Sequence, residues 1–186
     1  KICCSIQTDY RGLIDLVKAM NARFSDRTEI QKRSQKTLSL LFPGWMPPNY
    51  ATLFSKPFPE FSARMNAWAT MVGGTWLMGE CEVNDCELDD QGTIGKDQGL
   101  LVKRCRFLEE SQCASVCVNS CKIPTQNFFI EEMGLPLTMT PDYENFECQF
   151  AFGRMPDEQS ELEAKNTPCL SKCPSAGGLR EWHNDN

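Results

Sequence analysis

Histidine is almost absent from this chain of 186 residues, because His183 is the only one. Metal sites built from several histidines, including the site of ferrous oxygenases with two histidines and one carboxylate, are therefore excluded within one chain. The same scarcity argues against Ser-His and Cys-His nucleophilic catalysis. The sequence thus disfavours oxygenase and triad-hydrolase chemistry, and we interpret His183 as a tail residue rather than a ligand.

Long apolar runs and basic surface are also scarce. The uncharged run at residues 65–79 is shorter than the roughly 20 residues with which a helix crosses a bilayer. The formal net charge is −6, and nucleic acid binds mainly through Lys and Arg, so we expect no nucleic-acid partner. Residues 1–64 carry a net charge of +5 and residues 65–186 carry −11. The basic N-terminal part is therefore suited to contact with anionic lipid.

Apolar periodicity predicts an α+β fold in which helices dominate the first half and a small antiparallel sheet lies beside a cysteine-rich helical segment. Asp9 is expected to cap a first helix, and a second helix is expected from residue 26 through residue 41. A third is expected over residues 60–72, ended by Gly73 and Gly74. Short strands are expected near residues 81–84, 100–105, 137–140 and 147–152. The chain is long enough for one sizeable core.

Aromatic and proline residues are concentrated in residues 42–61, and this density of proline predicts an irregular loop. Three interpretations stay open at this stage. The rings pack back onto the helices, or they form a patch for a membrane or partner, for which Trp45 and Tyr50 are suited, or they form a wall of an apolar ligand pocket.

Cysteine is abundant, with eleven residues, and an odd number argues against a fully paired disulfide framework. Three cysteines recur at a spacing of four, which would place them on one face of a helix. Soft thiolates are natural ligands for an iron–sulfur cluster or, less favourably, zinc, but reduced core thiols and disulfides remain alternatives. The candidate metal ligands are Cys113, Cys117, Cys121, Cys148, Cys169 and Cys173.

The segment 105–129, which contains the three spaced cysteines, resembles the C-terminal signature of the plastid β-carotene isomerases of the strigolactone pathway. Four further segments resemble the same family in the same order: 76–84, 134–141, 146–153 and 168–173. The resemblance covers roughly residues 38–176. It divides the chain into a helical N-terminal extension (1–37), a β-carotene-isomerase-like domain (38–176) and a tail (177–186).

The resemblance implies an iron-binding chloroplast protein, in the stroma or at the periphery of the thylakoid membrane, that interconverts all-trans and 9-cis β-carotene. It assigns no catalytic or substrate-binding residue with security. Rotation about a double bond of a polyene requires a transient fall in bond order, which a redox-active iron centre beside an apolar slot could produce. Because histidine is so scarce, any such iron would depend mainly on thiolates.

A second function of another class stays open. The same chain could be a non-catalytic peripheral subunit or assembly factor of a photosynthetic membrane complex, in contact with bound carotenoid or lipid. An isomerase should change the isomer ratio of purified β-carotene, whereas a subunit should co-purify with a larger complex and leave that ratio unchanged.

Overall fold

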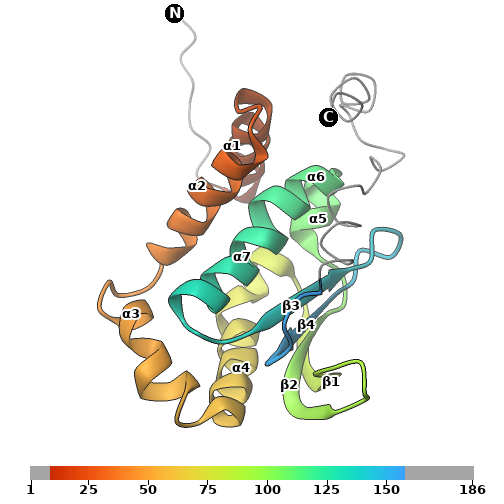
Figure 1. The fold of residues 1–186 in the computed structure, drawn as a ribbon. Helices are drawn as coiled ribbons and strands as arrows, with labels where there is room; N and C mark the ends of the chain where they lie inside the picture. Colours follow the sequence, from red (N-terminus) through yellow and green to blue (C-terminus); the bar gives the residue numbers. More distant parts are fainter. Residues whose placement is uncertain (1–8, 158–186) are drawn as a thin grey trace, which may run out of the picture.

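The computed structural model describes residues 9–157, and these adopt the expected α+β fold (Figure 1). The helices are α1 (Tyr10–Arg23), α2 (Arg27–Ser39), α3 (Met46–Tyr50), α4 (Pro59–Met78), α5 (Arg106–Ser111), α6 (Ala114–Cys117) and α7 (Ile123–Asn127). Segments with π-helical winding are η1 (Ala51–Ser55), η2 (Val118–Lys122) and η3 (Phe128–Glu132). The strands are β1 (Cys81–Glu87), β2 (Ile94–Val102), β3 (Leu137–Pro141) and β4 (Cys148–Phe152).

The four strands form one antiparallel sheet in the order β1-β2-β4-β3, which confirms the expected strand pairs. In one row across the sheet, Leu100 pairs with Phe150, which pairs with Met139, and all three are buried. The opposite face is polar, since Asn84 and Gln149 exchange hydrogen bonds of 2.9 and 3.0 Å between their side-chain amides. Because alternate residues of a strand point to opposite faces, the sheet has one apolar face and one polar face.

The apolar face is covered by helices. α6, η2, α7 and η3 follow one another without a break, because the residues that join them are also right-handed helical, and we call residues 114–132 the central helical segment. α2 packs along η2 and α7, α7 contacts β3, and α4 packs on β2, β1 and β4. The central helical segment therefore lies between the N-terminal helices and the sheet (Figure 1).

The predicted N-cap at Asp9 is present, and Asp26 caps the second helix in the same way. The carboxylate of Asp9 accepts a hydrogen bond from the amide of Gly12, and that of Asp26 accepts one from the amide of Thr28. The predicted end of the third helix is wrong, because α4 continues through Gly73 and Gly74 and ends only at Gly79, where φ is +94°. Glycine inside a helix costs about 1 kcal/mol, which the packing of α4 on the sheet outweighs.

The proline-rich stretch is more regular than predicted. α3 places its prolines in the first turn, where a helix needs no amide donor. Tyr50 is buried, and its hydroxyl accepts hydrogen bonds from Ser62 at 3.2 Å and from Asn66 at 2.7 Å. Trp45, by contrast, is 65% exposed. The stretch thus packs back onto α4 through Tyr50 and presents Trp45 to the outside.

The predicted boundary between residues 37 and 38 lies inside α2, which packs against the central helical segment. No helix within residues 9–157 is long and apolar enough to cross a membrane.

Candidate functional site: a buried thiol pocket

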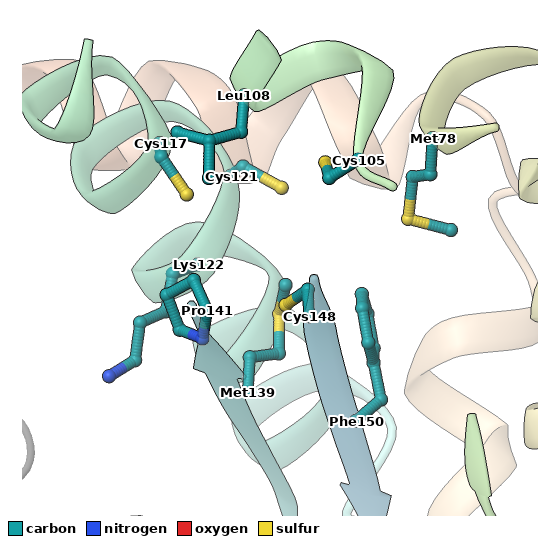
Figure 2. Close-up of a pocket in the computed structure, with 10 residues that line it drawn as sticks. All are labelled: Met78, Cys105, Leu108, Cys117, Cys121, Lys122, Met139, Pro141, Cys148 and Phe150. Atoms are coloured by element: carbon teal, nitrogen blue, oxygen red, sulfur yellow. The ribbon is translucent and has the colours of Figure 1, made fainter. Parts of the chain in front are cut away.

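A small pocket lies where the end of α4, the start of α5, the central helical segment and strands β3 and β4 meet (Figure 2). Cys105, Cys117 and Cys121 enter it from the helical side, and Cys148 enters from β4. The complete lining is Met78, Cys105, Leu108, Cys117, Cys121, Lys122, Met139, Pro141, Cys148 and Phe150. Four thiols therefore border one apolar space.

The free space in the thiol pocket is about 10 Å³, which is about the room that a single water molecule needs. Sites for organic ligands are usually roughly 300–1,000 Å³ in volume. In this conformation the thiol pocket is part of the closed core, and a long polyene does not fit inside it.

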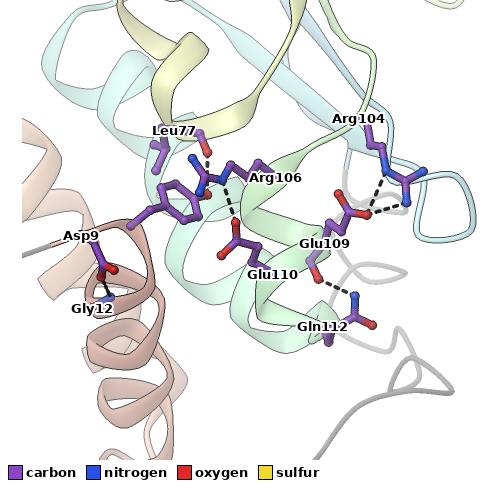
Figure 3. Close-up of polar contacts among 9 residues, drawn as sticks. Asp9, Gly12, Leu77, Arg104, Arg106, Glu109, Glu110 and Gln112 are labelled. Carbon is purple, nitrogen blue, oxygen red and sulfur yellow. Dashed lines mark hydrogen bonds and ion pairs between the residues drawn. The ribbon is translucent and has the colours of Figure 1, made fainter. Parts of the chain in front are cut away.

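Local ion pairs and hydrogen bonds hold the start of α5 in place (Figure 3). The hydroxyl of Tyr10 donates a 2.7 Å hydrogen bond to the carbonyl of Leu77, next to the lining residue Met78. The guanidinium of Arg106 lies 3.7 Å from the centroid of the Tyr10 ring and pairs with Glu110 at 2.7 Å. These contacts connect α1, the end of α4 and α5, and thereby position Cys105 beside the other thiols.

The structure brings together three of the six predicted ligands, Cys117, Cys121 and Cys148. Cys113 is not among the lining residues of the pocket. α5 ends at Ser111, Gln112 adopts a left-handed conformation with φ of 52°, and Cys113 is extended with φ of −144°. The expectation that the three spaced cysteines share one helix face is therefore wrong. Cys169 and Cys173 lie outside the described residues.

Two cysteines near the site were missed. Cys105 lines the pocket, and Cys81 lies on the same sheet face, because Cys81 pairs with Val102, which pairs with Cys148. The signal for Cys81 is the alternation of apolar residues in β1 and β2, which assigns it to the buried face. Cys105 precedes α5 directly, but only the tertiary fold shows that this turn faces β4.

Burial keeps the thiols protonated. Removal from water raises the pKa of Cys117 and of Cys148 well above the ordinary thiol value, and their thiol neighbours raise it further. Burial also raises the pKa of Cys121 to about 12 and that of Cys81 to about 11. The ammonium of Lys122 lowers the pKa of Cys117 and Cys148 but does not offset burial.

Cys105 differs from its neighbours in one respect. Burial raises the pKa of its thiol, but backbone N–H groups of Leu108 and Phe107 donate to the sulfur and oppose this rise. Because thiolates, not thiols, are nucleophiles and metal ligands, the pocket in this protonation state is chemically quiet. An added cation would have to displace protons from it.

The donor chemistry fits a soft metal, since four thiols and no competing carboxylate line the pocket. The geometry is less complete, because no group of three or more His, Cys, Asp or Glu side chains within residues 9–157 is arranged to hold a metal ion. Metal binding would therefore require the thiols to move closer together as well as to lose protons.

Comparison with known proteins gives consistent matches. Residues 76–161 match the family described as beta-carotene isomerase D27-like, C-terminal, and all ten lining residues of the thiol pocket lie within this range. The chain is 31% identical over 174 residues to "Beta-carotene isomerase D27, chloroplastic" of Arabidopsis thaliana, and the match covers 92% of the chain and 62% of that protein.

A protein with the same description from Medicago truncatula is 32% identical over 105 residues, which cover 56% of the chain and 40% of that protein. The chain thus spans less than two thirds of the length of both relatives. No solved structure matches it.

Proposed function

Because this chain belongs to the beta-carotene isomerase D27-like family, we propose that it is a plastid carotenoid isomerase that interconverts all-trans and 9-cis β-carotene. The observation that carries the proposal is the similarity over 92% of the chain to a relative described as a chloroplastic β-carotene isomerase. The family match includes every residue that lines the thiol pocket.

The chain's own residues contribute a water-poor, apolar environment to this reaction. Phe150, Met139 and Leu108 surround the thiols, and a buried site of this kind strengthens electrostatic and redox effects on a bound group. Because the pocket is too small for the polyene, we place the substrate against an adjoining apolar surface, with the thiol pocket behind it.

We also propose that iron, alone or in an iron–sulfur cluster, is the cofactor. Cys105, Cys117, Cys121 and Cys148 would hold it, and Cys169 and Cys173 remain further predicted ligands. Iron would supply the one-electron chemistry that lowers the order of the rotating double bond. The donor set of the pocket supports this proposal, as four soft ligands from three segments of the chain border one space.

The proposed location is the chloroplast, in the stroma or at the periphery of the thylakoid membrane, because both relatives are described as chloroplastic. The partner is then a carotenoid that is dissolved in lipid. The comparisons do not favour the alternative of a non-catalytic subunit of a photosynthetic complex, because both relatives are described as isomerases.

Two cysteines of similar burial provide a direct test. The protein is purified anaerobically, its iron and sulfide contents are measured, and detergent-solubilised all-trans β-carotene is incubated with it before the isomers are separated. Cys148→Ala removes a thiol of the pocket that is 5% exposed, and Cys86→Ala removes one outside the pocket that is 7% exposed. We expect the wild type and Cys86→Ala to bind iron and change the isomer ratio, and Cys148→Ala to lose both properties.

An iron-loaded wild type that leaves the isomer ratio unchanged contradicts the isomerase proposal. If Cys148→Ala retains the full iron content, the proposed role of Cys148 as a ligand is wrong. Stoichiometric co-purification with a larger complex, without any change in isomer ratio, supports the subunit function instead.

A further inference from the structure

The first half of helix α4 carries its side chains in the reverse of the usual order. The residues that are fully buried there are small or polar, whereas a helix on the surface of a water-soluble protein normally buries its large apolar residues. Towards its end α4 also buries Met78, and Met65, Met71 and Leu77 pack partly buried against the core. The buried residues within its first nine positions are Ser62, Ala63, Asn66 and Ala67. Large apolar side chains, each between 56% and 62% exposed, form an outward stripe that we call the α4 stripe: Phe61, Trp68, Val72 and Trp76.

The inward face of α4 is complete without these large side chains. Ala63 and Ala67 are 0% exposed, so the helix lies close to its neighbours. Asn66 donates hydrogen bonds of 2.7 Å to the hydroxyl of Tyr50 and 2.8 Å to the carbonyl of Ser62. A rotation of α4 that buried the stripe would break these contacts. The exposure of the α4 stripe is therefore built into the fold.

The α4 stripe is continuous and nearly free of charge. Its members are seven, four and four residues apart, so they follow one side of the helix over roughly 22 Å at 1.5 Å per residue. Arg64 is the only charged residue between Glu60 and Glu80. Isolated exposed apolar residues are ordinary, but an ordered row with two tryptophans marks an interaction surface.

We propose that the α4 stripe docks on the surface of a lipid bilayer, with α4 lying along the interface. Large residues outward and small residues inward are typical of a lipid-facing helix, and Trp and Phe prefer the boundary between headgroups and acyl chains. No carboxylate lies between Glu60 and Glu80 to be repelled by anionic headgroups.

The choice of lipid as the occupant also rests on the proposed function, because the carotenoid substrate dissolves in the acyl phase. α4 ends at Met78, which lines the thiol pocket. Met78 points to the buried side of α4, opposite Trp76, so docking through the α4 stripe places the thiol pocket behind the end of α4, close to a membrane in which the polyene is dissolved.

Vesicle flotation tests the proposal with matched variants of the full chain. The vesicles contain phosphatidylcholine and phosphatidylglycerol. Trp68→Ser/Val72→Ser removes two stripe residues that are each 59% exposed, and Leu16→Ser/Ile94→Ser removes exposed apolar residues from α1 and β2 that are 68% and 58% exposed. We expect the wild type and the control variant to float with the vesicles. The partition coefficient of the stripe variant onto the vesicles should be at least about tenfold lower.

Five outcomes decide between docking and its alternatives. Failure of the wild type to float, or equal loss in both variants, overturns the proposal. A concentration-dependent dimer that the stripe substitutions abolish, without flotation, assigns the surface to a second copy of the chain and also overturns it. Flotation that depends on the stripe supports docking even if β-carotene is not isomerised, in which case only the proposed function fails. Isomerisation in detergent by a wild type that never floats supports the function and overturns docking.

Discussion

The buried thiols make the stability of the metal-free, reduced chain sensitive to alkaline pH. Burial raises the pKa of Cys117 and Cys148 well above the value of 9.0 that describes an exposed thiol. Between that value and the folded-state pKa, the folded chain holds protons that the unfolded chain has released. The stabilisation is therefore fully present below about pH 9 and is lost as the pH rises towards the folded-state values.

The magnitude follows from the burial of these two side chains, each of which is 5% exposed. Each thiol contributes a slope of about 1.4 kcal/mol per pH unit in the window where only the unfolded form ionises. Raising the pH from about 8 to about 10 should then lower the free energy of unfolding by about 3 kcal/mol through this pair. Against a total stability of about 5–15 kcal/mol, such a loss is easily measured.

Urea denaturation of the chelator-treated, reduced protein at several pH values between these limits provides the assay. The control is Cys117→Ala/Cys148→Ala, which retains Tyr10 and every other titrating group, so that the difference between the two proteins isolates the pair. We expect the double variant to lose about 3 kcal/mol less than the wild type. An equal alkaline loss in both proteins would refute the inference that these thiols stay protonated in the folded state.

Three further predictions concern the free energy of unfolding in urea. Phe128→Ala should cost about 3–5 kcal/mol, because the ring is fully buried and stacks on Phe42 at a centroid distance of 5.0 Å. Phe61→Ala in the exposed stripe should change stability by less than about 0.5 kcal/mol. Equal costs of the two substitutions would contradict the assigned core. Tyr50→Phe should cost about 1–3 kcal/mol, because the buried donors Ser62 and Asn66 lose the Tyr50 hydroxyl, the acceptor that they share. An unchanged midpoint of the urea transition would mean that water replaces the hydroxyl. Gly134→Ala should destabilise the chain, because φ is +62° and the added methyl carbon would lie 2.7 Å from a neighbouring side chain; a neutral or stabilising effect would show that the turn relaxes.

Much of the fold was predictable because it depends on local patterns. Asp9 caps α1, as expected of a carboxylate that accepts from a free amide in the first turn, and α2 starts near Asp26 as predicted. Alternation of apolar residues predicted the strands. The end of α4 was not predictable from Gly73 and Gly74, because packing on the sheet offsets the local cost of glycine.

The sequence predicted that cysteines form the candidate site, but it did not predict which cysteines meet there. A spacing of four predicts neighbours only while the helix continues, and the left-handed Gln112 and extended Cys113 interrupt it before Cys117. Cys105 joins the pocket through a contact between a turn and a distant strand, and no local pattern contains that information.

By itself, the sequence determined the chemistry that is available: one histidine, eleven cysteines, and motifs that resemble one family. Residue types and ordered motifs are properties of the chain alone. Only the tertiary structure decided which thiols meet, that burial keeps them protonated, and that α4 exposes Trp68 and Trp76. These outcomes depend on long-range strand pairing and on which face of each helix packs against the core. Together these determine the distances between side chains and the exposure of each one.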